Sequence, residues 1–358
     1  MRRALEPWRV ALVALAAAAA VVPVSPALVE RVFSDGFYPQ IQPLLTGLSN
    51  RVPFALFDVL VAGAAAWWIV RGIRDLSGVR RQSAWTALLS IASRTVVIAA
   101  VAYLAFLLVW GLNYRRPPLT DRLAFEPARV TRTAAVDLAE QSVSQLNMLF
   151  AAAHEAGWPA AGESDEVLRE AFARTARALG SRWPIRPARP KTTLLDFYFR
   201  RAGVAGMTDP YFLETLVASD LLPFERPAVI AHEWSHLAGI TDEGEANFVG
   251  WVTCMQGAPR DRYSAWLFLY DELAAALPAA TVRNIAAALA GGPRADLLAI
   301  RARLQRNINP TVAVAGWRVY DSYLKANRVE EGAASYAGVV RLMTGTEFDP
   351  NWLPRLKP

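Results

Sequence analysis

The chain has 358 residues, of which 54% are hydrophobic, and its mean hydropathy is +0.20. This composition is too apolar for an ordinary soluble enzyme and indicates a membrane part. The pI of about 9.7 is compatible with nucleic-acid binding. However, the arginines are spread along the chain and flank apolar runs, so we expect no nucleic-acid partner. The single cysteine, Cys254, excludes an internal disulfide and a cysteine-based zinc site.

Three apolar segments predict a membrane region over residues 1–118, with transmembrane helices at about 8–29, 54–70 and 95–112. Each segment is near the length that crosses about 30 Å of hydrocarbon at 1.5 Å per residue. A cleaved signal peptide is the alternative for the first, because small residues occur around Ser25-Pro26-Ala27. The second has Asp58 near one edge and tryptophans near the other, as interfacial aromatics prefer.

The distribution of arginines predicts how these helices are oriented, because short arginine-rich loops usually stay in the cytoplasm. The segment before the first helix contains Arg2, Arg3 and Arg9, and the loop between the second and third contains Arg71, Arg74, Arg80 and Arg81. The loop between the first two helices holds only Arg31 and Arg51. We therefore expect a multi-pass protein of the cytoplasmic membrane, with its N-terminus in the cytoplasm and its C-terminal domain outside.

Residues 119–358 have a mixed amphipathic pattern and predict a globular domain with its own core. Helical spacing occurs over 133–156 and 164–179, and the runs 191–199 and 212–218 are rich in β-formers and predict strands. The predicted class is α+β, a mostly helical domain with a small sheet. The strand at 212–218 lies before the helix described next, and a peptide substrate could add to such an edge in extended form.

A pentapeptide in this domain predicts a metal site. It reads His232-Glu233-Trp234-Ser235-His236 and holds two of the three histidines of the chain. Prolines before it and a glycine after it predict a helix over 228–238, on which residues four apart share a face. Both imidazoles can then bind one Zn²⁺ ion, while Glu233 can take a proton from a water on that ion. This arrangement of residues is typical of zinc hydrolases, in which Glu233 would act as the general base.

A catalytic zinc usually has a third protein ligand and one open position, and three acids follow the motif. Glu245 shares a helical face with three apolar residues and is therefore expected on the inward face, where a metal ion would compensate its charge. Asp242 is the alternative, because its distance from His232 in the sequence resembles the metzincin spacing. Glu243 shares its face with small residues such as Gly250 and is expected to be solvated.

Five other side chains receive weaker assignments. A zinc peptidase needs a donor for the oxyanion, and Tyr263 and Tyr211 are candidates, although such tyrosines more often mark the boundary of a core. Tyr320 and Tyr323 are expected to contribute to core packing or to a cleft wall. His154 has no second histidine nearby and is expected to be structural or solvent-facing.

Several segments of the chain match a known pattern. They are Trp110 to Pro117, His232 to His236 followed by Glu245 to Phe248, and Tyr320 to Asn327 continuing to Gly332, Ser335-Tyr336 and Val339-Val340. Together they resemble a bacterial membrane family of unknown function, domain-of-unknown-function 3810. The resemblance implies a zincin-like domain behind membrane helices. It also favours Glu245 over Asp242 as the third ligand, since that glutamate belongs to the family motif.

The sequence thus predicts a membrane-anchored zinc metallopeptidase. It would use Zn²⁺ as cofactor, contact the lipid bilayer and cut a peptide or protein substrate in the cell envelope. One alternative is a catalytically inactive zinc-binding sensor or envelope assembly protein that retains the site. Another is a protease cutting inside the bilayer, which we disfavour because charged residues flank the motif helix and its apolar length is too short to span.

Overall fold

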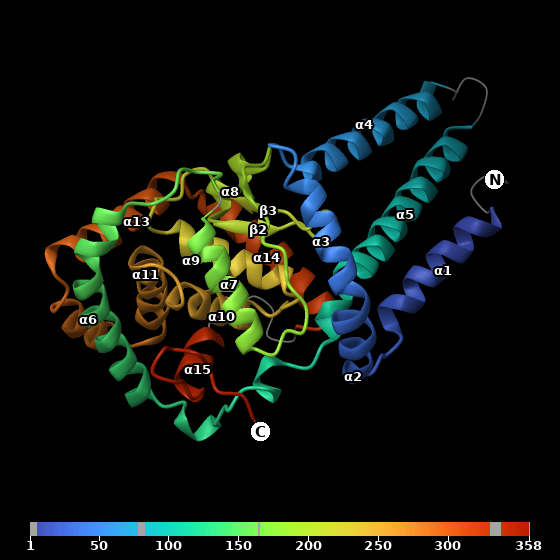
Figure 1. Ribbon diagram of the computed structural model, residues 1–358. Helices are drawn as coiled ribbons and strands as arrows, with labels where there is room; N and C mark the ends of the chain where they lie inside the picture. Colours follow the sequence, from blue (N-terminus) through green and yellow to red (C-terminus); the bar gives the residue numbers. More distant parts are fainter. Residues whose placement is uncertain (1–5, 78–82, 164, 330–337, 358) are drawn as a thin grey trace.

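The computed structural model describes residues 6–77, 83–163, 165–329 and 338–357. Within these ranges the protein is mostly helical with one small sheet, which confirms the predicted class (Figure 1). Several positions used in the predictions lie outside the described residues: Arg2, Arg3, Arg80, Arg81, residue 164, Gly332 and Ser335-Tyr336.

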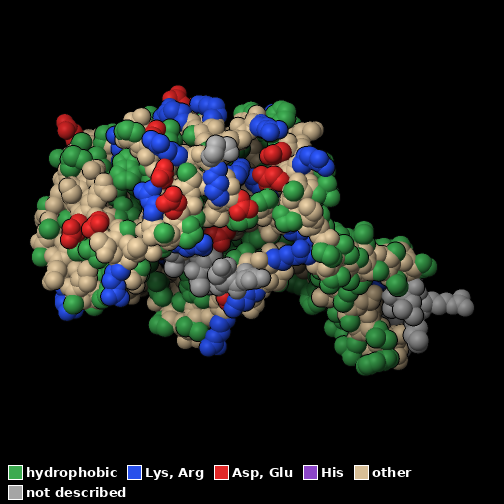
Figure 2. Space-filling model, turned by 90° about the horizontal axis from the view of Figure 1, so that it is seen from below, with side chains coloured by type: hydrophobic (Ala, Val, Ile, Leu, Met, Phe, Trp, Pro, Cys, Tyr) green, Lys and Arg blue, Asp and Glu red, His purple; other side chains and the backbone are tan. Residues whose placement is uncertain are grey.

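Two described helices are long and apolar enough to cross a membrane, α4 (Leu56–Ser77) and α5 (Ala84–Val109). They project from the rest of the protein, which we call the body (Figure 1). Figure 2 shows hydrophobic side chains over most of the visible surface of this projection, whereas charged side chains gather on the body. Both helices are longer than predicted, and α5 begins eleven residues before the third predicted span.

The first predicted span, 8–29, is broken in the structure. Helix α1 (Pro7–Val21) ends before Pro23, and the chain turns by 116° into the helical segment Pro26–Ser49. Val22 has an extended conformation, with φ −63° and ψ 122°, as expected for a residue that precedes a proline. If this bent pair counts as one span, the described residues contain up to three candidate spans.

The segment predicted as a loop between the first two spans is largely helical and belongs to the body. The π-helix η1 (Glu30–Phe37) and α3 (Tyr38–Ser49) lie in it, and α2 (Pro26–Val29), at the end of the first predicted span, precedes them. Its side chains Val29, Phe33 and Tyr38 are buried in the main hydrophobic core together with residues of the C-terminal half. Residue 118 is therefore not the limit of a separate membrane unit, because this segment buries its apolar face against the body.

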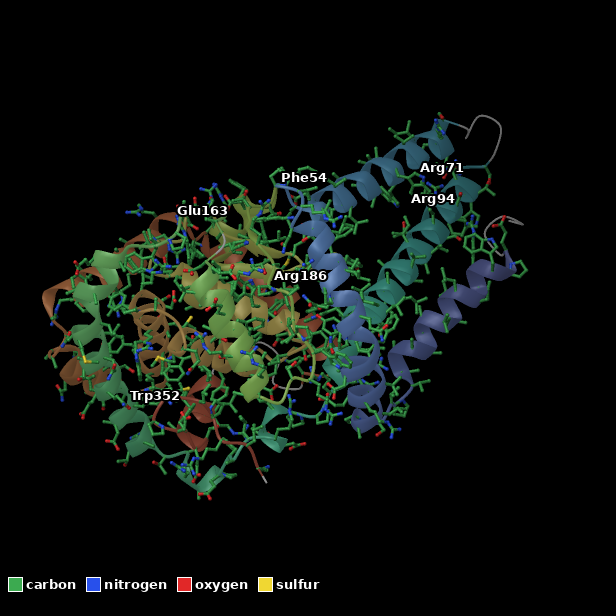
Figure 3. All side chains as sticks on the ribbon, in the orientation of Figure 1. Phe54, Arg71, Arg94, Glu163, Arg186 and Trp352 are labelled. Atoms are coloured by element: carbon green, nitrogen blue, oxygen red, sulfur yellow. The ribbon has the colours of Figure 1, made fainter. Side chains whose placement is uncertain are left out.

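The far ends of three helices lie near one another at one end of the protein (Figure 1). The N-terminal end of α1, the C-terminal end of α4 and the N-terminal end of α5 all lie at the tip of the projection (Figure 1). Phe54 lies where α4 leaves the body, and Arg71 and Arg94 lie toward the tip (Figure 3). Arg94 pairs with Asp75 there, which joins α4 to α5.

The body contains ten further α-helices within the described ranges: α6 (Arg132–Ala156), α7 (Glu166–Ala178), α8 (Asp196–Ala202), α9 (Arg226–Leu237), α10 (Glu243–Met255), α11 (Pro259–Ala276), α12 (Ala279–Ala286), α13 (Gly291–Asn307), α14 (Pro310–Ala326) and α15 (Gly338–Gly345). Helices α6 and α7 confirm the two helices predicted from spacing. The largest fully buried side chains include Trp234, Trp251 and Trp266, and they come from three consecutive helices, α9, α10 and α11.

The sheet has the strand order β1-β3-β2, with β1 (Pro190–Lys191) parallel and β2 (Gly206–Thr208) antiparallel to β3 (Thr215–Val217). The strand predicted at 212–218 is present as β3 but is central, and the two edge strands are β1 and β2, of which β2 lies beside α9. The predicted strand at 191–199 is wrong over most of its length. Its second half forms α8, because Asp196 accepts hydrogen bonds from the Ser219 backbone N–H and hydroxyl and so anchors a helical turn.

Asp261 in the first turn of α11 should make stability depend on pH. Burial and the nearby Asp165 raise its pKa from 3.8 to about 7, although it accepts a hydrogen bond from the Ala258 N–H at 2.8 Å. Because the folded state holds this proton more tightly than the unfolded state, folding loses free energy as the pH rises from about 4 to about 7.

Asp261→Asn keeps the accepting oxygen and removes the titration. We expect it to raise Tm by several °C at pH 8 and by little at pH 4. Thermal unfolding of the purified full chain in detergent at the two pH values measures this difference. A Tm difference that is the same at both pH values would contradict the assignment.

Candidate metal centre

Helix α9 carries the pentapeptide and is fixed in the core by its apolar face. Pro227 lies in its first turn, where the missing N–H costs nothing, and the helix ends one residue before Ala238. Gly239 follows with φ +75°, a conformation that favours glycine. Trp234 and Leu237 are fully buried, and Glu233 and His236 are buried as well, at 3% and 7% exposed. The predicted helix is confirmed.

The C-terminal end of α9 is held by residues next to the spanning helices. The indole N–H of Trp110, the first residue after α5, donates to the carbonyl oxygen of His236 at 2.9 Å. The Tyr38 hydroxyl donates to the carbonyl oxygen of Leu237 at 2.8 Å, and Arg116 donates to the carbonyl oxygens of residues 238 and 239. These carbonyls lack the i+4 backbone donor of a helix interior, and that of His236 also accepts from the Gly239 N–H at 2.9 Å. The segment Trp110 to Pro117 therefore forms part of the wall behind the candidate site.

Helix α10 crosses α9 at a glycine. A side chain at Gly250 would lie 2.8 Å from the backbone nitrogen of His232, so the two helices approach each other at this point because the residue has no Cβ. Glu243, the first residue of α10, lies two turns earlier on the same face. Its carboxylate is thereby brought to the two imidazoles.

Three ligand atoms converge in this cluster. The Nε2 atoms of His232 and His236 are 3.2 Å apart, and Oε2 of Glu243 lies 3.3 Å and 3.6 Å from them. In a tetrahedral zinc site with metal–ligand distances near 2.1 Å, neighbouring ligand atoms are separated by about 3.4 Å. Among the described residues this is the group of histidine and acidic side chains with a geometry that could hold a metal ion.

The hydrogen bonds around the cluster leave these three atoms available for a cation. Nδ1 of His236 lies 2.7 Å from the carbonyl oxygen of Ile240, which can only accept, so a neutral His236 keeps its proton on Nδ1 and its lone pair on Nε2. The Tyr320 hydroxyl donates to Oε1 of Glu243. Oε2 is buried and has no hydrogen-bond partner among the described groups. Such a donor set suits zinc.

The third residue of the cluster differs from the prediction. Glu243 is 2% exposed and not solvated as predicted. Asp242 is the N-cap of α10 and accepts a hydrogen bond from the Glu245 N–H at 2.9 Å. Glu245 accepts a hydrogen bond from the Leu119 N–H, on a different side of the helix. The assignment of an inward face failed because nearly all of α10 is buried, so its apolar positions do not distinguish one face from another.

Electrostatic coupling within the cluster is strong. Burial alone would raise the pKa of Glu243, but the charge of His236 and interactions with His232 lower it below its ordinary value. Burial alone would lower the pKa of His236, but the Glu243 carboxylate raises it to about 9. The protein without a metal ion therefore stabilises a positive charge between these side chains, at the position where the ligand atoms converge.

Glu233 lies beside the cluster and packs against the edge strand. The Thr208 hydroxyl is 2.9 Å from Oε2 of Glu233 and 2.8 Å from its carbonyl oxygen. A Cβ atom at Gly206 would lie 2.7 Å from Oε1 of Glu233, so glycine is required for this close approach. Burial raises the pKa of Glu233 and the two histidines oppose that shift. A carboxylate with a raised pKa is suited to accept a proton near neutral pH.

Two tyrosines of α14 lie at the cluster and were not identified as site residues from the sequence. Tyr320 bonds to Glu243, and its ring is stacked on Tyr323 at a centroid distance of 5.9 Å. The Tyr323 hydroxyl lies 3.4 Å from that of Tyr114, just after α5. Burial is the main cause of the raised pKa of Tyr323, and the negative charge of Glu243 adds to it. Tyr320 and Tyr323 are three residues apart on α14, and this spacing could have indicated from the sequence that the two rings lie on the same face of a helix.

The two tyrosines predicted as oxyanion donors bond elsewhere. The Tyr263 hydroxyl is buried and donates to Asp296 at 2.6 Å. Asp296 also lies 2.8 Å from Nε2 of His154, which supports a structural role for that histidine. The Tyr211 hydroxyl lies 3.4 Å from the carbonyl oxygen of Ala102 in α5. The hydroxyl groups of both tyrosines thus bond to other parts of the protein, and Tyr320 is the tyrosine that bonds to the cluster.

The resemblance noted in the sequence extends over most of the chain. The model of a family described as "Protein of unknown function (DUF3810)" matches residues 33–344. The chain belongs to this family. The region matched by the DUF3810 model contains the spanning helices α4 and α5, the Trp110 to Pro117 segment and the metal cluster. No curated protein and no solved structure matches the chain.

Proposed function

We propose that the protein is a membrane-anchored, zinc-dependent peptidase whose catalytic residues lie in a zincin-like body. The observation that carries the proposal is the convergence of His232, His236 and Glu243 at separations of 3.2–3.6 Å, which match those of tetrahedral zinc ligands. Glu233, between the two histidines in sequence, supplies a buried carboxylate beside them. These four residues provide the ligands and the general base that metal-assisted hydrolysis needs.

Each side chain has a separate role in this proposal. Zinc supplies Lewis acidity, which makes a water molecule acidic enough to lose a proton near neutral pH and polarises a carbonyl group. Glu233 accepts the proton of the attacking water and later delivers it to the leaving nitrogen. The Thr208 hydroxyl holds one carboxylate oxygen of Glu233. Tyr320 orients Glu243 through Oε1, and Trp110 fixes the helix end that carries His236.

The free edge of β2 supports a peptide as substrate. Ala205 and Asp209 form hydrogen bonds with residues next to β3. Because bonding directions alternate along an antiparallel pair, the backbone N–H and C=O groups of Gly206 and Thr208 point to the other edge. Both residues also contact Glu233. An extended peptide that added to this edge would lie next to the proposed general base.

The side of the membrane follows from the arginine pattern and is part of the proposal. The helix ends near the arginine-rich segments lie at the tip of the projection, and the body lies at the opposite end (Figure 1). With a cytoplasmic tip, the body lies outside the cytoplasm, next to the outer surface of the cytoplasmic membrane. A site in the body also argues against cutting within the bilayer.

The proposal is tested with the purified full chain in detergent. We expect about one zinc ion per chain by elemental analysis and hydrolysis of an unstructured protein such as reduced casein, abolished by a chelator and restored by Zn²⁺. A chain that binds no zinc would overturn it. Zinc retained without turnover on casein or on a random peptide library would favour the alternative, a catalytically inactive zinc-binding sensor or envelope assembly protein.

Gly206→Ala tests the contact between the edge strand and the proposed base. The added Cβ must displace the buried Glu233 carboxylate, so we expect turnover to fall by about 10²-fold while zinc content stays the same. Gly291→Ala is the matched control, because nothing lies within 4 Å of a Cβ at that position. Unchanged turnover in Gly206→Ala would show that the position of Glu233 next to β2 does not matter for hydrolysis.

A further inference from the structure

The loop after β2 connects the proposed site to the outer ends of the spanning helices. Tyr211 lies in this loop, and its hydroxyl reaches the carbonyl oxygen of Ala102. Ala102 precedes Val109, the last residue of α5, by two helical turns, which is ~10 Å along the helix axis. The Tyr211 ring also stacks on Phe57, in the first turn of α4, at a centroid distance of 6.3 Å. The loop therefore extends past the end of α5, to the level where both helices enter the membrane.

The two spanning helices contact each other near the tip and separate toward the body (Figure 1). In the half near the tip, Trp68 donates to Thr95 at 3.0 Å and Arg94 pairs with Asp75. Toward the body, Tyr211 contacts both α4 and α5. The chain that continues from β2, which bonds to Glu233 through Thr208, thus reaches both spanning helices at Tyr211.

The body also has exposed apolar side chains where α4 begins. Phe54 is 52% exposed, and Leu194 and Phe197 are 78% and 62% exposed. Leu194 is tied to the first turn of α4, because its backbone N–H donates to Asp58 at 2.8 Å. Side chains of this kind at the end of a spanning helix are expected to enter the lipid interface. They would hold the body against the bilayer surface.

We propose that the substrates are membrane-anchored polypeptides, cut close to their anchor on the side of the body. This inference rests on the proposed peptidase function. A chain that leaves the bilayer beside α5 meets the loop at Tyr211 and then the free edge of β2. Trp110 bonds directly to the backbone of His236, so the metal cluster lies only a few side-chain lengths from the end of α5. An extended chain covers ~3.3 Å per residue, so a short stretch of the substrate next to its anchor is enough to reach the cluster.

The experiment uses the full chain in liposomes with a pool of randomised segments. Each segment is present twice on one transmembrane anchor, once directly after the anchor and once beyond a long flexible spacer, and the same pool is also supplied in soluble form. Mass spectrometry identifies the cut positions. We expect the copy near the anchor to be cut at least about tenfold faster than the distant copy and the soluble pool, because the spacer dilutes the distant copy near the site. Tyr211→Ala should reduce this ratio and leave zinc content unchanged.

The possible outcomes separate this inference from the function on which it rests. Equal cutting of the near copy, the distant copy and the soluble pool would leave the peptidase function intact and overturn the preference for anchored substrates. A ratio that Tyr211→Ala does not change would overturn the role of the loop. No cutting of any pool by zinc-loaded protein would overturn the peptidase function and this inference with it.

Discussion

Glu243→Gln is expected to reduce zinc affinity by on the order of 10²-fold or more, because it removes one of three protein ligands. The carboxylate has no other partner at Oε2, and its two nearest polar neighbours there are the ligand nitrogens of His232 and His236. A neutral amide at this position cannot compensate the charge of the ion. Competition with a chelator of known affinity, monitored for wild type and variant, measures the loss.

Matched controls are available at the two acids that the sequence favoured. Glu245→Gln retains an oxygen for the Leu119 N–H, and Asp242→Asn retains an N-cap for α10. We expect both variants to bind zinc like the wild type. Loss of zinc in one of these controls, with zinc retained in Glu243→Gln, would return the third ligand to the residue first predicted. Size-exclusion chromatography and thermal unfolding show whether each variant is folded.

The sequence was sufficient where a local pattern determines the structure. The pentapeptide helix is bounded by Pro227 and Gly239, so both its limits could be predicted to within two residues. The spanning helices α4 and α5 follow from their length and composition. The family resemblance came from short segments and is confirmed over residues 33–344.

The sequence was insufficient where contacts between distant segments determine the structure. The third residue of the cluster depends on how α10 crosses α9, and the crossing point is set by Gly250 against the backbone of His232. Helical periodicity cannot reveal this, because a helix buried on all sides has no polar face to orient it. The sequence did contain one indication of the third residue. Gly250 allows close packing of a second helix, and Glu243 lies two turns earlier on the same face of α10.

The same limitation explains the errors at the membrane boundary and in the sheet. Residues 30–53 are predicted as a loop between two spans, but Tyr38 donates to a carbonyl of α9 and its ring is buried in the body. Strand β2 has only three residues and includes a glycine, so its composition does not predict a strand. These residues form a strand because they pair with β3, and this pairing depends on the tertiary fold and not on their own composition.

Glu233→Gln is expected to lower turnover by about 10²–10⁴-fold while zinc content and zinc affinity stay close to those of the wild type. The carboxylate is not among the three converging ligands, and its raised pKa is caused first by burial. The amide is nearly the same size and can still accept a hydrogen bond from Thr208, but it cannot take a proton from water. Peptide hydrolysis and elemental analysis on the same preparation measure both quantities.

Glu272→Gln is the control that makes this result specific. Glu272 lies on α11. Burial and the nearby Asp271 raise its pKa to about 7, and the charge of His232 opposes this shift. Glu272 is therefore a second acid that interacts electrostatically with the cluster. It is not part of the converging group. We expect turnover in Glu272→Gln to stay within about threefold of the wild type, since an acid outside the cluster is not positioned for proton transfer. If Glu272→Gln abolishes hydrolysis and Glu233→Gln does not, the general base is Glu272, and the pentapeptide supplies only the metal ligands.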